Sequence, residues 1–322
     1  MANDRGELGD ARDRNAARAQ AVRRRVASIE GLVRLPTVCT APPDVLLGAA
    51  LVAGAGIGVS LLDVAGLSMA SIFLFAGVST FLDESDSSGI ESERLVRTVE
   101  PSRRATVLLG GAFLATGVVV AGASTGVTGA LVAGSLAVVV VVAEGRTSDA
   151  PVGVLSRGGT RALNVLLGVT AGMGAAGVSS SDLPGTAIVV PLVIGGYVST
   201  VVAISPVETA GSDRRAIATA GAAVVFAVVA LGWFLVWIDA GPLELVLSLS
   251  LAAAFAGLVG RAILRAYAEP VSVVVAPAVG TALFGLVLLE AAFAVAGGVE
   301  WALAIAAFGF PFAVLSRRFA VR

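Results

Sequence analysis

Long apolar stretches alternate with short polar ones over most of the chain. A helix rises about 1.5 Å per residue, so roughly 20 apolar residues cross a hydrocarbon core about 30 Å thick. Each stretch is predicted to be a helix, because a helix satisfies its own backbone hydrogen bonds in lipid. The candidate spans are residues 45–62, 64–82, 105–122, 127–143, 162–178, 186–204, 216–237, 243–259, 271–295 and 301–316.

Composition supports this pattern. Hydrophobic residues make up 57% of the 322 residues and charged residues only 14%, with a mean hydropathy of +0.92, whereas a soluble domain carries about 25% charged residues. The prediction is an all-α, polytopic membrane helix bundle with about nine or ten transmembrane helices. A net charge of -1 provides no basic field for nucleic acid, so the expected partners are membrane lipids and no nucleic acid.

The distribution of charge predicts the orientation in the membrane. All 22 basic residues are arginines, and they lie in the two tails or in the second, fourth, sixth and eighth connections between spans. Because basic residues accumulate on the cytoplasmic side, we expect ten spans in the cell membrane with both termini cytoplasmic. A nine-span arrangement would place the C-terminal arginines outside. The only charged residues in the odd-numbered connections are acids, namely Asp63, Asp182, Asp239, Glu244 and Glu300.

The chain divides into an Arg-rich cytoplasmic tail, residues 1–31, and a single transmembrane domain, residues 32–322. Apolar residues recur at helical spacing near the end of the tail, so the tail is either an interfacial helix on the inner leaflet or a solvated basic segment. Cys39 is the only cysteine, which excludes an internal disulfide, and the chain has no histidine.

The second connection offers candidate chemistry. Asp83 and Asp86 follow the second span three residues apart, which places both carboxylates on one face if the helix continues for another turn. Clustered carboxylates suit Mg²⁺, which prefers oxygen ligands and bridges to phosphates. Arg94 and Arg97 come next, and guanidinium groups bind phosphate bidentately. The alternative is a solvated charged loop of the kind that any polytopic protein carries.

Two later segments reach the same membrane face. The sixth connection carries Glu208 and Asp213 followed by Arg214, and the fourth connection leads to Arg161 and Asn164 at the start of the fifth span. If the three connections converge, these residues form one mouth with acids for a metal and arginines for phosphate. Asn164 also fits a hydrogen bond between helices.

Glu290 lies inside the ninth span, within the apolar segment GLVLLEAAFAV. An ionisable group in lipid is costly and usually faces the bundle interior. Two interpretations stay open: a role with a substrate hydroxyl or a proton, or a protonated or hydrogen-bonded structural residue.

Four segments resemble the UbiA-type intramembrane prenyltransferase superfamily, in particular its EboC-like divergent branch. They are LVRLPTVCTAPPDVLLGAAL before and in the first span, FAGVSTFLDESDSS with the basic segment after it, GTRALNVLLGV, and SPVETAGSDRRA. The family's first acidic motif has Asn before its acids, where this chain has Phe81 or Leu82, and its third acid has no clear counterpart here. Glu208 and Asp213 are five residues apart instead of four.

The resemblance implies a UbiA-like prenyltransferase that moves a prenyl group from an allylic prenyl diphosphate to an unknown acceptor. It implies Mg²⁺ held by Asp83, Asp86, Glu208 and Asp213 as the catalytic and metal-binding residues. The substrate would be bound by Arg94, Arg97, Arg161, Asn164, Arg214 and Glu290. Two alternatives remain: a catalytically silent relative that binds a prenyl lipid, and a small-molecule transporter.

Overall fold

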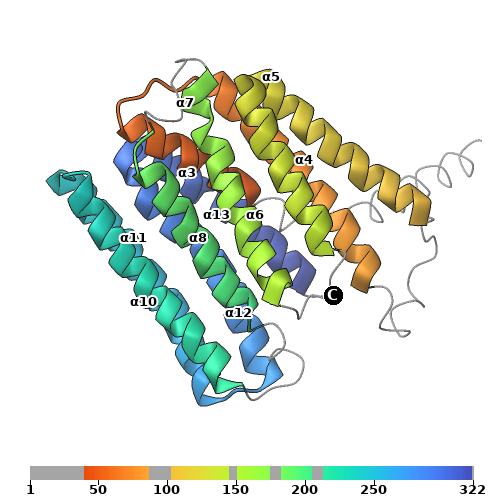
Figure 1. Ribbon diagram of the computed structural model, residues 1–322. Coiled ribbons are helices and arrows are strands. Elements are labelled where there is room, and N and C mark those ends of the chain that lie inside the picture. Colours follow the sequence, from red (N-terminus) through yellow and green to blue (C-terminus); the bar gives the residue numbers. More distant parts are fainter. Residues whose placement is uncertain (1–39, 87–102, 145–150, 175–182, 205–212, 321–322) are drawn as a thin grey trace, which may run out of the picture.

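The computed structural model describes residues 40–86, 103–144, 151–174, 183–204 and 213–320. Within these ranges every regular element is helical, and the long helices run side by side in one bundle (Figure 1). The predicted all-α membrane bundle is therefore confirmed. The predicted boundary between the tail, 1–31, and the transmembrane domain lies outside the described residues.

The elements follow the chain in the order shown in Figure 1. They are α3 (Ala41–Gly54), α4 (Leu61–Asp86), α5 (Arg103–Glu144), α6 (Pro151–Val169), the single turn α7 (Ala171–Gly174), α8 (Thr186–Val202), α10 (Arg214–Trp237), α11 (Pro242–Ala268), α12 (Ser272–Ala294), the 3₁₀ turn η3 (Val295–Gly297) and α13 (Val299–Ala320).

Helix α5 is two helices joined at a sharp turn. Thr125 and Gly126 leave the helical conformation, and Gly126 has a φ of +71°, a region that glycine enters without steric cost. A Cβ placed on Gly122 would lie 3.2 Å from the Cβ of Ala130, whereas residues eight apart in a straight helix are separated by about 12 Å. The chain therefore folds back here, as expected from the separate predicted spans 105–122 and 127–143.

Three predicted spans have wrong boundaries, and one of them is the eighth, expected at 243–259, where α11 continues to Ala268. The first was expected at 45–62, but α3 ends at Gly54 and residues 55–60 are not helical, because this glycine-rich segment includes Gly56 at a φ of +78°. The fifth was expected at 162–178, but α6 covers Pro151–Val169. The start of α6 was missed because Arg157 and Arg161 lie inside the helix, and charged residues lower the hydropathy by which spans are predicted.

Several helices can cross a membrane by length and composition. Four stretches of the described chain qualify: Arg104–Val141, Arg214–Trp237, Pro242–Ala268 and Ser272–Gly297. Shorter apolar helical stretches occur at Ala41–Gly54, Leu61–Gly77, Thr186–Val202 and Val299–Gly309. The first of the four contains the turn of α5, so its two limbs pass side by side.

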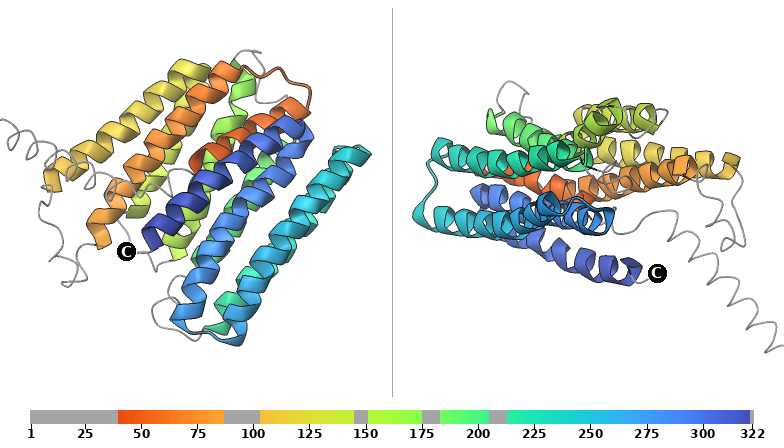
Figure 2. Two further views of the ribbon diagram at one scale, coloured as in Figure 1. Left: turned by 180° about the vertical axis from the view of Figure 1, so that it is seen from behind. Right: turned by 90° about the horizontal axis from the view of Figure 1, so that it is seen from below.

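The two ends of the bundle differ in the charge of the connections between their helices. Helices α4, α8 and α11 end, and α6, α10 and α12 begin, at the end that lies lower in Figure 1 and that also holds the C-terminal end of α13 (Figures 1 and 2). These helix ends flank the four Arg-bearing connections. The alternation of charge seen in the sequence thus corresponds to two distinct ends of one bundle.

Helix α3 lies between two apolar cores. Leu47 and Leu51 belong to a larger core formed mainly by α8, α10, α11 and α12, whereas Val45 and Ala49 belong to a smaller core of α4, α5 and α6. Both cores are mainly aliphatic, with aromatic rings such as Phe234 and Phe255 in the larger one, and their burial excludes water from the centre of the bundle. A polar residue on α3 is therefore enclosed on every side.

Glycines bring α3 and α6 into close contact. A Cβ on Gly48 would overlap the carbonyl oxygen of Val165, and one on Gly168 would overlap that of Val45. Small residues at these positions let the two helix backbones approach closely. Gly58, by contrast, lies outside the helix and has no neighbouring atom within 4 Å of its would-be Cβ.

Candidate functional site

A group of polar side chains is buried where α3, α4, α6 and α12 meet. It consists of Asp44, Ser71, Arg161, Asn164 and Glu290, which we call the buried polar cluster. Asp44, Ser71 and Asn164 are fully buried and Glu290 is 1% exposed. Polar groups removed from water need partners inside the protein, so their contacts define what the cluster can do.

Asp44 and Arg161 form an ion pair inside the bundle. Nη1 of Arg161 donates to Oδ2 of Asp44 at 2.9 Å and to the Thr40 carbonyl oxygen at 2.7 Å, while Nη2 donates to the Thr40 hydroxyl. The guanidinium also lies over the Phe75 ring, 5.0 Å from its centroid, a favourable cation–π arrangement. Arg161 thus fastens the first turn of α3 to α6 and α4.

Asn164 lies one helical turn after Arg161 and joins three helices. Its Nδ2 donates to Oδ2 of Asp44 at 2.8 Å and to the Ala41 carbonyl oxygen at 2.9 Å. Its Oδ1 accepts from the Ser71 hydroxyl at 2.7 Å. The predicted interhelical hydrogen bonding by Asn164 is what the structure describes.

Glu290 completes the cluster from α12. Its carboxyl lies within electrostatic reach of Asp44 and Arg161. With both acids as carboxylates no hydrogen bond joins them: among the described residues, Oδ1 of Asp44 and both oxygens of Glu290 lack a donor. Three buried carboxyl oxygens are therefore left without partners, which is costly in a water-poor interior.

The local sequence explains this geometry. Pro42 and Pro43 favour the start of a helix, because proline fixes φ and its missing N–H is not needed there. Asp44 then falls in the first turn of α3, where the helix dipole favours an acid. One turn later Gly48 allows the backbone contact with α6. That contact brings Asp44 within hydrogen-bonding distance of Arg161 and Asn164.

Three of the four predicted metal-binding acids, Asp83, Asp86 and Asp213, lie at the end of the bundle that the Arg-bearing connections join, which we call the charged end. Asp83 and Asp86 lie in the final turns of α4, which stays helical through Asp86, as the spacing argument required. They are about 18 Å and about 22 Å, respectively, along the helix axis from Ser71 of the buried polar cluster. Glu208, Arg94 and Arg97 lie outside the described residues.

Asp213 and Arg214 are described at the start of α10. Asp213 is its N-cap residue: Oδ1 accepts from the backbone N–H groups of Arg215 at 2.9 Å and Ala216 at 3.4 Å. Arg214 is exposed, and its guanidinium lies 5.8 Å from the centroid of the Tyr267 ring of α11. Figure 1 shows the start of α10 at the same end of the bundle as the end of α4.

The structure therefore divides the predicted site residues into two groups. Arg161, Asn164 and Glu290 come together around Asp44, which the sequence reasoning had not singled out, while Asp83, Asp86, Asp213 and Arg214 lie at the charged end. Asp44 gave one usable signal, an acid directly after Pro-Pro at the edge of an apolar run, which reads equally well as an ordinary helix start.

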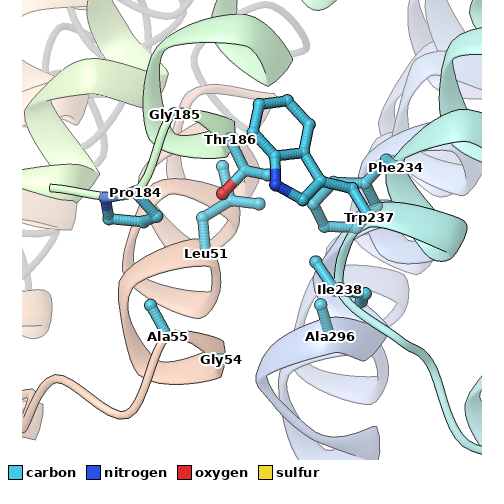
Figure 3. A pocket seen from close by; sticks show the side chains of 10 residues that line it. All are labelled: Leu51, Gly54, Ala55, Pro184, Gly185, Thr186, Phe234, Trp237, Ile238 and Ala296. Carbon is cyan, nitrogen blue, oxygen red and sulfur yellow. The ribbon is translucent and has the colours of Figure 1, made fainter.

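A separate pocket of about 240 Å³ lies between α3, α8, α10 and η3. Apolar side chains such as Leu51, Phe234 and Trp237 line it, together with Pro184 (Figure 3). These residues lie where α3 and α10 end and α8 begins, so the pocket is at the end of the bundle opposite to the charged connections. It contains none of the predicted site residues.

Comparison with known proteins is informative only at the level of structure. No protein family model and no curated protein sequence matches the chain. A solved structure of digeranylgeranylglyceryl phosphate synthase aligns with a TM-score of 0.57, covering 85% of this chain and 99% of that chain at 14% identity. The chain has the UbiA-type fold.

A solved structure of a UbiA homologue from Archaeoglobus fulgidus bound to DMAPP and Mg²⁺ aligns with a TM-score of 0.46, at 19% identity, covering 83% of this chain and 99% of that one. The UbiA-type fold and the long apolar helices identify the chain as an integral membrane protein. At these identities the likeness concerns the fold and not the chemistry.

Proposed function

We propose that this protein is a UbiA-like membrane prenyltransferase, which moves a prenyl group from an allylic prenyl diphosphate to an acceptor. The observation that carries the proposal is the fold shared with digeranylgeranylglyceryl phosphate synthase over 85% of the chain. The acids at the end of α4 support it, because they lie at the end of the bundle that gathers the arginines. We place this end at the cytoplasmic face of the cell membrane.

Mg²⁺ fits the residues of the charged end by donor chemistry. Among the described residues no three acid, His or Cys side chains lie together as a metal site, so the proposal rests on donor chemistry and includes Glu208, which lies outside them. The candidate donors Asp83, Asp86, Glu208 and Asp213 are all carboxylates, which are the oxygen ligands that Mg²⁺ prefers. When bound, Mg²⁺ would neutralise diphosphate charge and make it a better leaving group.

The chain's own residues have distinct parts in this proposal. Arg94, Arg97 and Arg214 bind the diphosphate, because guanidinium groups pair bidentately with phosphate oxygens. Arg161 and Asn164 act as positioning residues, since their polar groups hold the first turn of α3. The apolar cores on both sides of α3 keep water away from the allylic cation, so that the acceptor captures it instead.

The experiment is Mg²⁺-dependent binding of labelled geranylgeranyl diphosphate to the full-length protein in detergent. We expect saturable binding that chelation abolishes and that falls at least tenfold in Asp83→Asn and Asp86→Asn. Asp63→Asn is the matched control, because it removes a carboxylate at the opposite end of the same helix. Binding that is absent, or that does not depend on metal, contradicts the proposal for this donor.

A silent relative is the second candidate, and the capping role of Asp213 favours it, because one of its oxygens is already engaged by α10. Release of inorganic diphosphate separates the two. A prenyltransferase supplied with a membrane-lipid extract as acceptor source releases diphosphate over time, whereas a silent relative binds the donor without releasing it.

A further inference from the structure

We propose that Asp44 and Glu290 share one proton, so that the buried polar cluster is a proton-binding site that joins α3 to α12. The inference does not depend on prenyl transfer. It rests on the contacts, burial and charge of the cluster itself. Both acids are at least 99% buried, and their three unpartnered oxygens all belong to this one group.

The charges of the cluster balance only with a proton present. Arg161 supplies one positive charge, whereas two ionised acids would supply two negative ones. Among the described residues, Asp44 and Arg161 are the charged groups that interact with Glu290. An unbalanced charge in a low-dielectric interior is strongly disfavoured, and protonation of one acid removes it.

The missing donor is also explained by a proton. The donors described in the cluster are already committed elsewhere: Arg161 and Asn164 both donate to Oδ2 of Asp44, and Ser71 donates to Asn164. A carboxylic acid O–H between Glu290 and Oδ1 of Asp44 supplies the one donor that the pair lacks. Such charge-assisted O–H···O bonds are short and strong.

Among the described residues of the neighbouring helices, no side chain supplies that donor. The Tyr197 hydroxyl of α8 donates a hydrogen bond to the Ala282 carbonyl oxygen of α12 at 2.9 Å. Ser248 of α11 donates to the Ala292 carbonyl oxygen at 2.9 Å. A metal ion fits this cluster less well than a proton. The cluster has only two acids, and no group of three or more potential metal-ligating side chains occurs among the described residues.

Infrared spectroscopy of the full-length protein in lipid nanodiscs tests the proposal. A protonated carboxyl gives a carbonyl stretch that moves to lower frequency in deuterated water, and an ionised one does not. We expect the wild type to show this band and Glu290→Gln to lose it. Asp44→Asn is expected to lose it as well, because Glu290 would then ionise and become the partner of Arg161.

Glu244→Gln is the matched control, since Glu244 is a partly exposed acid at the N-terminal end of α11, and its substitution leaves the band in place. A wild type without the band overturns the proposal. A band that is lost in Glu290→Gln but persists in Asp44→Asn overturns the sharing, because Glu290 would then hold its proton independently of Asp44.

Stability against pH provides a second readout. Raising the pH from mildly acidic to alkaline removes the shared proton and leaves two negative charges beside Arg161, so the wild type should unfold at progressively lower SDS fractions. Glu290→Gln has no proton to lose and should show a flatter profile while folding normally. Equal slopes, or a wild-type slope abolished by added sodium, would overturn the proposal.

Discussion

Arg161 is the residue whose loss the buried polar cluster tolerates least. It provides the cluster's positive charge and donates to Asp44 and Thr40, so its removal leaves Asp44 buried without a counter-charge. We predict that Arg161→Gln lowers the free energy of unfolding by about 3 to 5 kcal/mol, as for other broken buried pairs. Unfolding by SDS titration in mixed micelles measures it.

Arg157→Gln is the control for this substitution. Arg157 lies one turn earlier on α6 and is only partly buried, so a change within about 0.5 kcal/mol is expected. Equal losses in the two variants would show that charge along α6 matters in general and that the pair with Asp44 does not.

Asp213 allows its two possible roles to be separated. Asn is as good an N-cap as Asp, whereas Ala is not, so Asp213→Ala should lower the free energy of unfolding by about 1 kcal/mol and Asp213→Asn by much less. If Asp213 also binds Mg²⁺, Asp213→Asn loses metal-dependent donor binding although its stability is kept. Donor titrations and SDS unfolding on both variants distinguish the outcomes, and intact binding in Asp213→Asn assigns the residue to capping alone.

At the scale of single residues, a buried ionisable group can be recognised from the sequence only where apolar residues surround it on both sides. Glu290 was found because ten apolar or small residues surround it in GLVLLEAAFAV. Asp44 was missed because it stands at the edge of an apolar run, and its partner Arg161 is 117 residues away. No local spacing connects two residues that meet only through helix packing.

The contact between α3 and α6 depends on glycines at the points where the backbones meet. Gly168→Ala would place a methyl group against the Val45 backbone, so the helices must separate and the pair between Asp44 and Arg161 must loosen. We predict a loss of about 1 to 3 kcal/mol in the free energy of unfolding, the usual cost of overpacking. SDS titration measures this loss.

Gly159→Ala is the matched control, because Gly159 is also in α6 but has open space around its would-be Cβ. Alanine favours a helix over glycine by up to about 1 kcal/mol, so this variant should be neutral or slightly stabilised. A destabilised Gly159→Ala would mean that α6 requires glycine for a reason other than its contact with α3.

At the scale of elements, hydropathy located helices well and their ends less well. The fourth, sixth, seventh and ninth predicted spans lie within a few residues of helical segments of the structure. The fifth failed because α6 begins at Pro151, eleven residues before the predicted span, with Arg161 inside the bundle paired to α3. A hydropathy window treats that arginine as the boundary of a span, because hydropathy does not take into account its ion pair with Asp44.

At the scale of the whole molecule, orientation is the open prediction. The charged end is expected in the cytoplasm, because all arginines lie on that side of the predicted spans. In a Cys39→Ser background, Ala268→Cys at the end of α11 should react with an impermeant thiol reagent only in inside-out vesicles. Ala240→Cys, between α10 and α11, should react only in right-side-out vesicles. The reverse pattern would invert the topology.

The distance along the chain between Asp44 and Arg161 also has a consequence for biogenesis. The two residues are 117 positions apart, and ribosomes add about 5 to 20 residues per second, so Asp44 is synthesised roughly 6 to 23 s before its partner. During that interval α3 carries an acid that no later helix has yet neutralised. Helix α3, the first helix of the described residues, therefore settles into its buried pair only after α6 has been synthesised.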